Sequence, residues 1–335
     1  MSVYLGVDGG GSKTAFVLVD DRGAILAEFI GGSSYYFDIG LDEAARVLSD
    51  GVGTVLALAS LTSADVTHAF FGIPGYGEAS RDIALLRGLP GRILGHDRYD
   101  CDNDMVPGWA GSLAGEDGIN VICGTGSMTY GERAGRGCRV GGWGELFGDD
   151  GSAYWIAIHG LNLFTRMSDG RLPKGPLHGA LTRRLGLDSD LDVVSLLAEG
   201  RNGRRTEVAD LARVVSQAAD EGDEEARRLL VRAGDELAQL VVTTAARLGY
   251  TAAEVIPVSF SGGVFASAVV RDAFADALVS DPGVYDLREP LLAPVTGAAL
   301  QAARKAGTPL DAESIGRLVR RRIVGSSKRA SGLIT

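Results

Sequence analysis

Three glycine-rich turns in the sequence could bind phosphate groups. They read DGGGSKT at residues 8–14, GTGS at 124–127 and SGG at 261–263, and each follows an apolar segment typical of a buried strand. Glycine has no Cβ, so it can adopt positive φ and its N–H group can approach a ligand closely. Successive N–H groups in such a turn form a concave anion site. One such turn would be weak evidence, but three after comparable strands indicate a phosphate-binding protein.

The first turn differs from two common nucleotide-binding motifs. Lys13 follows Ser12 directly and a hairpin comes next, whereas a Walker loop or a GxGxxG turn would have to open a helix. We therefore predict a phosphate clasp built on hairpins, in which Ser12, Lys13 and the loop amides meet phosphate oxygens. For Lys13, a solvated side chain is an equal alternative. Asp8, at the strand end, could hold Mg²⁺ through water because hard cations prefer oxygen ligands.

A group of acids could supply a catalytic base. Asp100, Asp102, Asn103 and Asp104 lie close together between a predicted strand end and a helix. Phosphoryl transfer to an alcohol needs a base near the hydroxyl, a metal that spreads the phosphate charge and in-line positioning. A carboxylate at this place could point into a cleft and act as that base. From the residues alone, however, a helix cap is the favoured interpretation of Asp102 or Asp104.

The segment GGWGELFGDDGSAYWIA, residues 141–157, could bind a sugar. Its acid pair, Asp149 and Asp150, offers acceptors for sugar hydroxyls, and Trp143 offers an aromatic face for an apolar ring face. The alternative interpretation is structural. Trp143 would then be a core residue, and Asp149 or Asp150 would cap the following helix.

Two successive sets of strands and helices are predicted to position these groups. The recurring order indicates a degenerate duplication with a boundary near Gly115–Gly118, although the 48 glycines of the chain make chance similarity a live alternative. The first set comprises strands at 3–8, 14–20 and 24–30, a helix at 41–61, a strand at 68–75, a helix at 78–89 and a strand at 91–97. The second comprises a strand from Ile119, short strands up to Gly142, helices over most of 150–248, a strand at 255–263 and a helix at 264–278.

Composition and charge bound the possible functions. The chain has 335 residues, 45% of them apolar, which favours two domains with sizeable cores. The formal net charge of −10 argues against a nucleic-acid partner, and the basic run at 317–322 is interpreted as the solvated face of a terminal helix. No apolar run is long enough to span a membrane, and no secretory signal precedes the first strand. Cys101, Cys123 and Cys138 lack disulfide or metal spacing, so we expect packing residues in a cytoplasmic protein.

Several motifs resemble those of a known group. GVDGGGSKT, ICGTGS and FSGG resemble the phosphate-one, phosphate-two and adenosine motifs of the superfamily of actin, heat-shock ATPases and sugar kinases. The segment at 141–157 is more specific and is similar to the signature of N-acetylglucosamine kinases, within the BadF/BadG/BcrA/BcrD-type ATPases. The resemblance runs from Tyr4 to about Ala303 and is weakest across 165–250.

This resemblance implies an α/β fold. It implies two actin-like ATPase (ribonuclease H-like) lobes with five-stranded mixed sheets around a central cleft. The first lobe would comprise residues 1–116, completed by a terminal helix at 310–323, and the second residues 117–309. The family also implies a homodimer formed through the second lobe.

The resemblance further implies roles for individual residues. Asp104 occupies the place of the family's catalytic aspartate, about twenty residues before the Gly-Thr-Gly turn, and would accept the proton of the sugar hydroxyl. The implied sugar contacts are Ser34, Tyr35, Asp104, Gly142, Trp143, Gly144 and Asp149. The implied nucleotide contacts are Gly10, Gly11, Ser12, Lys13, Thr14, Gly124, Thr125 and Gly126 for the phosphates and Ser261, Gly262 and Gly263 for adenosine, with Asp8 holding Mg²⁺ through water.

The predicted reaction is ATP-dependent phosphorylation of the 6-hydroxyl of N-acetylglucosamine, with both lobes closing to exclude water. Tyr35 stands where the family has an asparagine that contacts a sugar hydroxyl, so glucosamine, N-acetylmuramate or an aminocyclitol stays open as the acceptor. Another alternative is an ATPase that activates a partner enzyme through an iron–sulfur cluster, which the cysteine spacing disfavours. A sugar sensor with a DNA-binding helix-turn-helix is disfavoured because the first strand begins at Val3.

Overall fold

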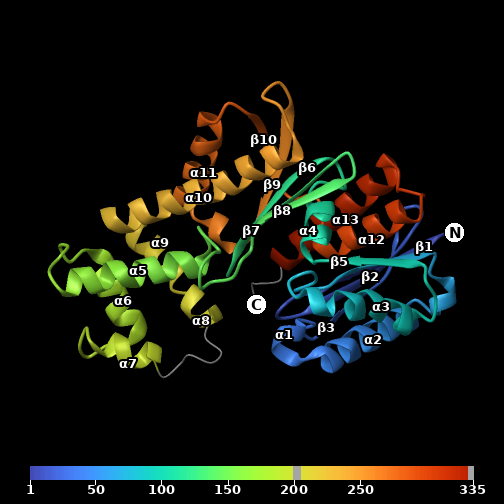
Figure 1. The fold of residues 1–335 in the computed structure, drawn as a ribbon, viewed down its shortest axis with the longest axis horizontal. Coiled ribbons are helices and arrows are strands. Elements are labelled where there is room, and N and C mark those ends of the chain that lie inside the picture. Colours follow the sequence, from blue (N-terminus) through green and yellow to red (C-terminus); the bar gives the residue numbers. More distant parts are fainter. Residues whose placement is uncertain (199–204, 331–335) are drawn as a thin grey trace. The chain divides into compact units, whose positions relative to one another are not determined.

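The computed structural model describes residues 1–198 and 205–330 (Figure 1). The chain divides into two compact units. Unit 1 comprises residues 1–116 together with the chain from Pro290 onward, and unit 2 comprises Asp117–Glu289. Each unit contains one five-stranded mixed sheet, which confirms the predicted α/β class.

The sheet of unit 1 has the strand order β3-β2-β1-β4-β5. The first three strands form an antiparallel meander, and β4 and β5 run parallel to β1. Parallel pairing aligns Asp8 with Gly72 and Gly72 with Asp102, so the carboxyl ends of three strands meet at one edge. The strands are β1 (Val3–Asp8), β2 (Thr14–Asp20), β3 (Ile25–Gly31), β4 (His68–Gly72) and β5 (Tyr99–Asp102).

Helices cover both faces of this sheet, because alternate side chains of a strand point to opposite faces. On β2, Phe16 and Leu18 pack in the core that includes α2, whereas Val17 and Val19 pack in the core that includes α12. All four side chains are buried. The helices are α1 (Tyr36–Ile39), α2 (Leu41–Leu58), α3 (Ile83–Leu94), α4 (Met105–Ser112), α12 (Pro294–Lys305) and α13 (Ala312–Ala330), with short 3₁₀ turns at Ser63–Asp65 and Ser80–Asp82.

Residues 290–309, predicted to belong to the second lobe, belong to unit 1 instead. Helix α12 packs against β1 and α4 within this unit. A Cβ on Gly297 would lie 2.2 Å from backbone atoms of Pro107 and Gly111, so glycine lets the two helices approach to backbone contact. Helix α13 reaches the β2–β3 turn, where the Ser314 hydroxyl donates to the Asp21 carbonyl at 3.5 Å.

The strand predicted at 91–97 is wrong. Residues 91–94 continue α3, which ends at Gly95 in the left-handed conformation (φ +74°). Leu86, Leu89 and Leu94 are buried on this helix, so the apolar pair Ile93–Leu94 follows a helical spacing rather than opening a strand. The fifth strand is β5, which holds two of the acids considered above. The helix predicted at 78–89 accordingly begins five residues later, at Ile83.

The sheet of unit 2 repeats the topology of unit 1. Its order is β10-β9-β6-β7-β8, again an antiparallel meander followed by two parallel strands. This repetition supports the predicted duplication over chance similarity of glycine-rich turns. The strands are β6 (Gly118–Cys123), β7 (Ser127–Arg133), β8 (Arg136–Gly141), β9 (Val255–Ser261) and β10 (Val284–Arg288).

A helical layer accompanies this second sheet. The long helix α10 packs against β7, β8 and α11, and the buried hydroxyls of Thr129 and Thr244 join β7 to α10 at 2.6 Å. Across residues 1–198 and 205–330, we find no helix with the length and apolar character needed to cross a membrane. The helices are α5 (Ala153–Ser168), α6 (Pro176–Leu185), α7 (Asp192–Ala198), α8 (Arg205–Ala209), α9 (Ala212–Asp220), α10 (Glu224–Leu248) and α11 (Ala268–Ser280), with a 3₁₀ turn at Gly263–Ala266.

Candidate active site

Two carboxylates from distant parts of the sequence come together at the strand ends of unit 1. Asp8 ends β1 and is paired with Gly72 at the end of β4. Helix α4 begins against this point, because a Cβ on Gly72 would lie 3.2 Å from the Asp104 Cα and 2.6 Å from the Pro107 ring. The order β1-β4-β5 therefore places the predicted metal residue and the predicted base side by side.

Asp8 is electrostatically unusual. Burial raises the pKa of its carboxyl to about 8, the nearby Asp104 carboxylate adds to the rise, and Lys13 opposes it. A divalent cation beside the pair would relieve this repulsion, so the donor chemistry fits Mg²⁺. In the described parts of the chain, no three His, Cys, Asp or Glu side chains group closely enough to hold a metal. An ion at Asp8 would therefore rely on water and on phosphate oxygens for most of its ligands, as Mg²⁺ commonly does.

Asn103, not an aspartate, caps helix α4. Its buried side chain accepts the Met105 N–H at 3.2 Å and donates to the Tyr76 carbonyl at 3.1 Å. Asp104 stands at the N-cap position, but its side chain makes no capping hydrogen bond. Asp102 accepts the adjacent Asn103 N–H at 2.7 Å. The capping interpretation of Asp104 is therefore wrong, and its half-buried carboxylate lies beside Asp8.

The phosphate-one turn joins β1 to β2. Gly11, Ser12 and Lys13 are exposed, and a Cβ on Gly11 would meet nothing within 4 Å, which leaves room for a ligand. The Gly10 carbonyl accepts the Ser33 hydroxyl at 3.1 Å and the Ser34 N–H at 3.3 Å. Gly9, Gly10 and Gly11 do not adopt positive φ, so this turn makes no use of that freedom of glycine.

Thr14 and Ser34, predicted to contact nucleotide and sugar, contact each other. The Thr14 hydroxyl donates to the Ser34 Oγ at 2.9 Å, and both side chains are fully buried. Their side chains are therefore part of the buried packing that supports the phosphate-one turn. A Cβ on Gly9 would lie 2.5 Å from both the Ser34 Oγ and the Pro74 ring, so close packing makes Gly9 necessary.

An aromatic cluster surrounds Tyr35, and the sequence prediction did not include its other members. Tyr35 is half-buried and meets Phe37 edge to face at 5.6 Å between ring centroids, while Tyr36 stacks on Phe37 at 4.3 Å. Phe37 is 46% exposed. Gly75, with φ +79°, lies against the rings of Tyr36 and Phe37. The signal for this cluster was present as the run YYF, although nothing local indicated the loop beneath it.

A pocket of about 850 Å³ in unit 2 brings two predicted motifs together. Gly124 and Thr125 of the phosphate-two turn line it together with Gly263 of the adenosine motif. Gly126, Ser261 and Gly262 do not line it. Helices α8 and α9 form one wall of this pocket, and the sequence did not predict that wall. The only sequence feature of these residues was an amphipathic helical pattern, which does not indicate a binding site. The further lining residues are Ala153, Ile156, Thr206, Ala209, Asp210, Ala212, Arg213, Ser216, Gln217, Asp220, Val264, Ala266, Ser267 and Ala268.

Two glycines near this pocket are fixed by close packing. Gly262 has φ +109°, and a Cβ there would lie 2.0 Å from the Cys123 carbonyl oxygen, so only glycine fits. A Cβ on Gly126 would lie 2.6 Å from the Asp149 Oδ2 and 2.8 Å from the Arg205 Nη2. The Ser261 hydroxyl donates to the Val121 carbonyl at 3.4 Å. Gly124, in contrast, faces open space.

The first half of the segment at 141–157 presents large apolar side chains to solvent, whereas Trp155, Ile156 and Ala157 are buried. Trp143 is 73% exposed, so the core interpretation of this residue is wrong, and Leu146 and Phe147 are more exposed still. Gly142 has φ +71° and donates its N–H to the Ser127 carbonyl at 2.9 Å. Ser152 caps α5 by accepting the Trp155 N–H at 3.2 Å. The two aspartates of the segment therefore do not cap this helix.

Asp149 is the buried member of that acid pair. It has φ +55°, a conformation rarely taken by a residue with a Cβ. Its Oδ1 accepts the Gly144 N–H at 3.3 Å, and its Oδ2 accepts the Arg205 Nη2 at 2.6 Å. Asp150 is exposed, and its carbonyl accepts the Ser127 hydroxyl at 2.6 Å.

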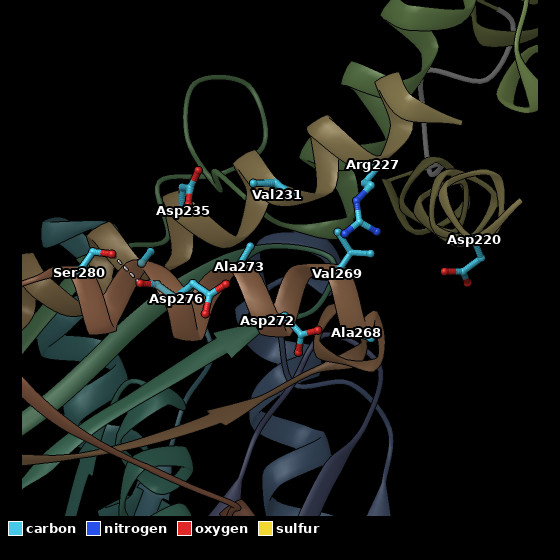
Figure 2. A pocket seen from close by; sticks show the side chains of 11 residues that line it. Asp220, Arg227, Val231, Asp235, Ala268, Val269, Asp272, Ala273, Asp276 and Ser280 are labelled. Atoms are coloured by element: carbon cyan, nitrogen blue, oxygen red, sulfur yellow. Dashed lines mark hydrogen bonds between the residues drawn. The ribbon is translucent and has the colours of Figure 1, made fainter. Parts of the chain in front are cut away.

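A second pocket of unit 2 contains none of the predicted residues. It measures about 530 Å³ and lies between α10 and α11, where Asp235, Asp272 and Asp276 outnumber the single Arg227 (Figure 2). Asp220 and Ala268 line this pocket and the larger one. Its lining is strongly negative and includes none of the glycine turns, so we do not assign it to a nucleotide.

Comparison with known proteins identifies relatives over most of the chain. Residues 5–302 match the model of the BadF/BadG/BcrA/BcrD ATPase family. The N-acetyl-D-glucosamine kinase of Dictyostelium discoideum is 28% identical over 311 residues, which cover 90% of this chain and 97% of that protein. The N-acetylmuramic acid/N-acetylglucosamine kinase of Clostridium acetobutylicum is 32% identical over 240 residues, which cover 71% of this chain and 77% of that protein.

The fold has a counterpart among solved structures. A candidate N-acetylglucosamine kinase from Chromobacterium violaceum superposes with a TM-score of 0.69 at 25% identity, covering 90% of this chain and 99% of that one. The resemblance predicted from the glycine turns and the segment at 141–157 is confirmed.

Proposed function

This chain belongs to the BadF/BadG/BcrA/BcrD ATPase family, and from that premise we propose that it is a sugar kinase which transfers the γ-phosphoryl group of ATP to the 6-hydroxyl of N-acetylglucosamine. The observation that carries the proposal is the carboxylate of Asp104. It lies beside Asp8 at the strand ends of unit 1, while Asn103 takes over the capping of α4. A carboxylate at the edge of the sheet, beside a predicted metal residue, is suited to act as a base.

In the proposed reaction, Asp104 orients the acceptor hydroxyl and accepts its proton as the oxygen bonds to the γ-phosphorus. The bond from the γ-phosphorus to the bridging oxygen breaks, and ADP leaves. The exposed amides and side chains of Gly11, Ser12 and Lys13 bind phosphate oxygens. Asp8 would hold Mg²⁺ through water, and the ion would supply positive charge to the phosphates when bound. The proposed base belongs to unit 1 and the proposed nucleotide pocket to unit 2.

We assign the pocket of about 850 Å³ to the nucleotide, with Thr125 toward the phosphates and Gly263 toward adenosine. Its volume lies within the ~300–1,000 Å³ typical of small-molecule sites. Within the third turn, Gly262 serves close packing against Cys123 rather than ligand approach.

N-acetylmuramic acid is the second candidate acceptor. The Clostridium acetobutylicum relative, at 32% identity, is named for both sugars. Tyr35 is bulkier than the asparagine of the family pattern, and with Phe37 it forms a partly exposed aromatic surface. Such a surface could contact the lactyl ether that distinguishes N-acetylmuramic acid from N-acetylglucosamine.

An iron–sulfur activator is the less favoured alternative. Cluster ligation requires thiolates, whereas burial raises the pKa of Cys101 to about 11 and raises that of Cys123 as well. Cys123 and Cys138 are buried in unit 2, as expected of packing residues.

The deciding experiment is a coupled ADP-release assay of the purified protein with ATP, Mg²⁺ and a panel of acceptors. The panel comprises N-acetylglucosamine, N-acetylmuramic acid, glucosamine, N-acetylmannosamine and glucose, with ³¹P and ¹H NMR to locate the phosphate on the product. We expect the highest kcat/KM for N-acetylglucosamine and phosphate on its 6-oxygen. If no sugar stimulates ADP release above the acceptor-free rate, the proposal is wrong. Light scattering of the same sample tests the homodimer that we propose for the native protein.

A further inference from the structure

The segment 142–149 reverses the usual segregation of side chains. Its apolar members, Trp143, Leu146 and Phe147, are 73%, 86% and 79% exposed. Its acidic members, Glu145 and Asp149, contact a single cation, Arg205 of helix α8. A surface that exposes three large apolar side chains together usually marks a binding site. Arg205 binds the two acidic side chains of the segment, Glu145 and Asp149.

Arg205 makes two ion pairs across a long sequence separation. Its Nη2 lies 2.6 Å from the Asp149 Oδ2, and its Nε lies 3.2 Å from the Glu145 Oε2. The Asp149 side chain is only 3% exposed, whereas that of Arg205 is 42% exposed. The Nη2 of the guanidinium therefore neutralises the buried carboxylate of Asp149, and its Nε binds Glu145 in the middle of the apolar segment.

The same ion pair adjoins the phosphate-two turn. A Cβ on Gly126 would lie 2.8 Å from the Arg205 Nη2, and the next residue, Thr206, lines the pocket that we assign to the nucleotide. The Gly144 N–H donates to the other oxygen of Asp149, which folds the segment back onto the turn. Arg205 thus links the segment to the element that would bind phosphate.

Three charged or ionisable side chains from different elements surround Asp149. Burial raises the pKa of its carboxyl, Arg205 on α8 lowers it, and Glu145 in the same segment raises it. Cys123 on β6 also lies close enough to interact with the carboxylate. The backbone N–H groups of Gly144 and Ser127 further stabilise the ionised form. Without Arg205, the carboxylate would be buried beside Glu145 with no cation to offset the cost.

We propose that Arg205 is a positioning residue for the sugar acceptor. It keeps Asp149 ionised and holds segment 142–149 against the phosphate-two turn, so that Trp143, Leu146 and Phe147 present an apolar surface to the acceptor ring. The proposal rests on the kinase function above, since the apolar surface needs a sugar to cover. Glu145 and Asp149 are the two attachment points, and Arg205 is their shared partner.

The kinetic test compares Arg205→Ala, Arg205→Lys and the control Arg228→Ala. Arg228 forms an ion pair with Glu225 within α10, outside segment 142–149 and helix α8. We expect Arg205→Ala to raise the KM for N-acetylglucosamine by roughly tenfold or more, with the KM for ATP changed less than about threefold. Arg205→Lys should raise the KM for N-acetylglucosamine less than Arg205→Ala does, because lysine keeps the positive charge but cannot pair with both carboxylates as the guanidinium does. The acidic limb of kcat/KM should move to higher pH in Arg205→Ala, because Asp149 loses the group that lowers its pKa. Equal rises in both KM values, or no rise, would overturn the proposal.

A second measurement does not depend on catalysis. Hydrogen–deuterium exchange should show faster exchange of the amides in 142–149 in Arg205→Ala than in wild type or Arg228→Ala, with β9 and β10 unchanged as evidence that unit 2 is folded. If wild type phosphorylates no sugar, the proposed function fails while this exchange result still tests the tether. Unchanged exchange across 142–149 in Arg205→Ala would show that Arg205 does not position the segment.

Discussion

Replacement of Asp104 by asparagine should strongly slow phosphoryl transfer and leave the fold intact. Asparagine preserves size and hydrogen bonding but cannot accept a proton at neutral pH. General-base catalysis contributes typically about 10²- to 10⁴-fold, so kcat should fall by that factor. The KM for the acceptor should change little, because the amide oxygen still accepts a hydrogen bond from the sugar hydroxyl.

The structure explains why stability should survive this change. The Asp104 side chain makes no capping hydrogen bond to α4, since Asn103 supplies the contact to Met105. Loss of the Asp104 charge also removes a like-charge neighbour of Asp8, whose pKa should fall from about 8. We therefore expect a melting temperature no more than about 2–4 °C below that of wild type, which corresponds to ~1 kcal/mol for a domain of the size of unit 1.

Asp100→Asn is the matched control. Asp100 stands four residues earlier on β5, and its carboxylate contacts His68 at 2.8 Å with a side chain 42% exposed. A partly exposed pair of this kind contributes about 0–1 kcal/mol to the free energy of unfolding. Because Asp100 has no role in the proposed reaction, kcat of this variant should stay within about twofold of wild type. The assay is initial-rate ADP release with saturating ATP, Mg²⁺ and N-acetylglucosamine, together with thermal unfolding of each variant. If Asp104→Asn keeps more than about a tenth of the wild-type kcat, Asp104 is not the base.

Three further predictions test other parts of the structure. Gly297→Ala should destabilise by at least ~1–3 kcal/mol in urea unfolding, because its Cβ would lie 2.2 Å from backbone atoms of α4, whereas Gly88→Ala, with nothing within 4 Å, should stabilise by about 0.5–1 kcal/mol. Comparable effects of the two substitutions would contradict the packing described for α12. With a chelator present, the stability that Asp8 contributes should be lost as the pH rises from 3.8, the ordinary pKa of an aspartate, through about 8, the pKa of Asp8 in the folded protein, because the folded protein binds this proton more tightly than the unfolded chain. The variant Asp8→Asn should flatten this pH dependence of the free energy of unfolding. An unchanged slope in the variant would refute the prediction. Ser216→Trp should fill the pocket of about 850 Å³ and raise the KM for ATP about tenfold or more, with the KM for sugar unchanged. An unaltered KM for ATP would show that the nucleotide binds elsewhere.

The parts of the fold that follow local rules were predictable from the sequence. The β2–β3 hairpin, the strand before each glycine turn and the helix at 41–58 all show periodicity or turn residues within a few positions of one another. The exceptions were also local. Residues 91–94 combine apolar side chains with flanking glycines, a pattern that fits both a short strand and the last turn of a helix.

For the candidate site, the sequence by itself determined which groups are available: Asp8 at a strand end, Asp104 at the start of a helix, and the exposed glycine turns. Only the tertiary structure decided which of them meet. Asp8 and Asp104 come together because β4 inserts between β1 and β5, and Arg205 reaches Asp149 from 56 residues away. Such contacts depend on strand order and helix packing, and the spacing of residues along the chain carries no record of either.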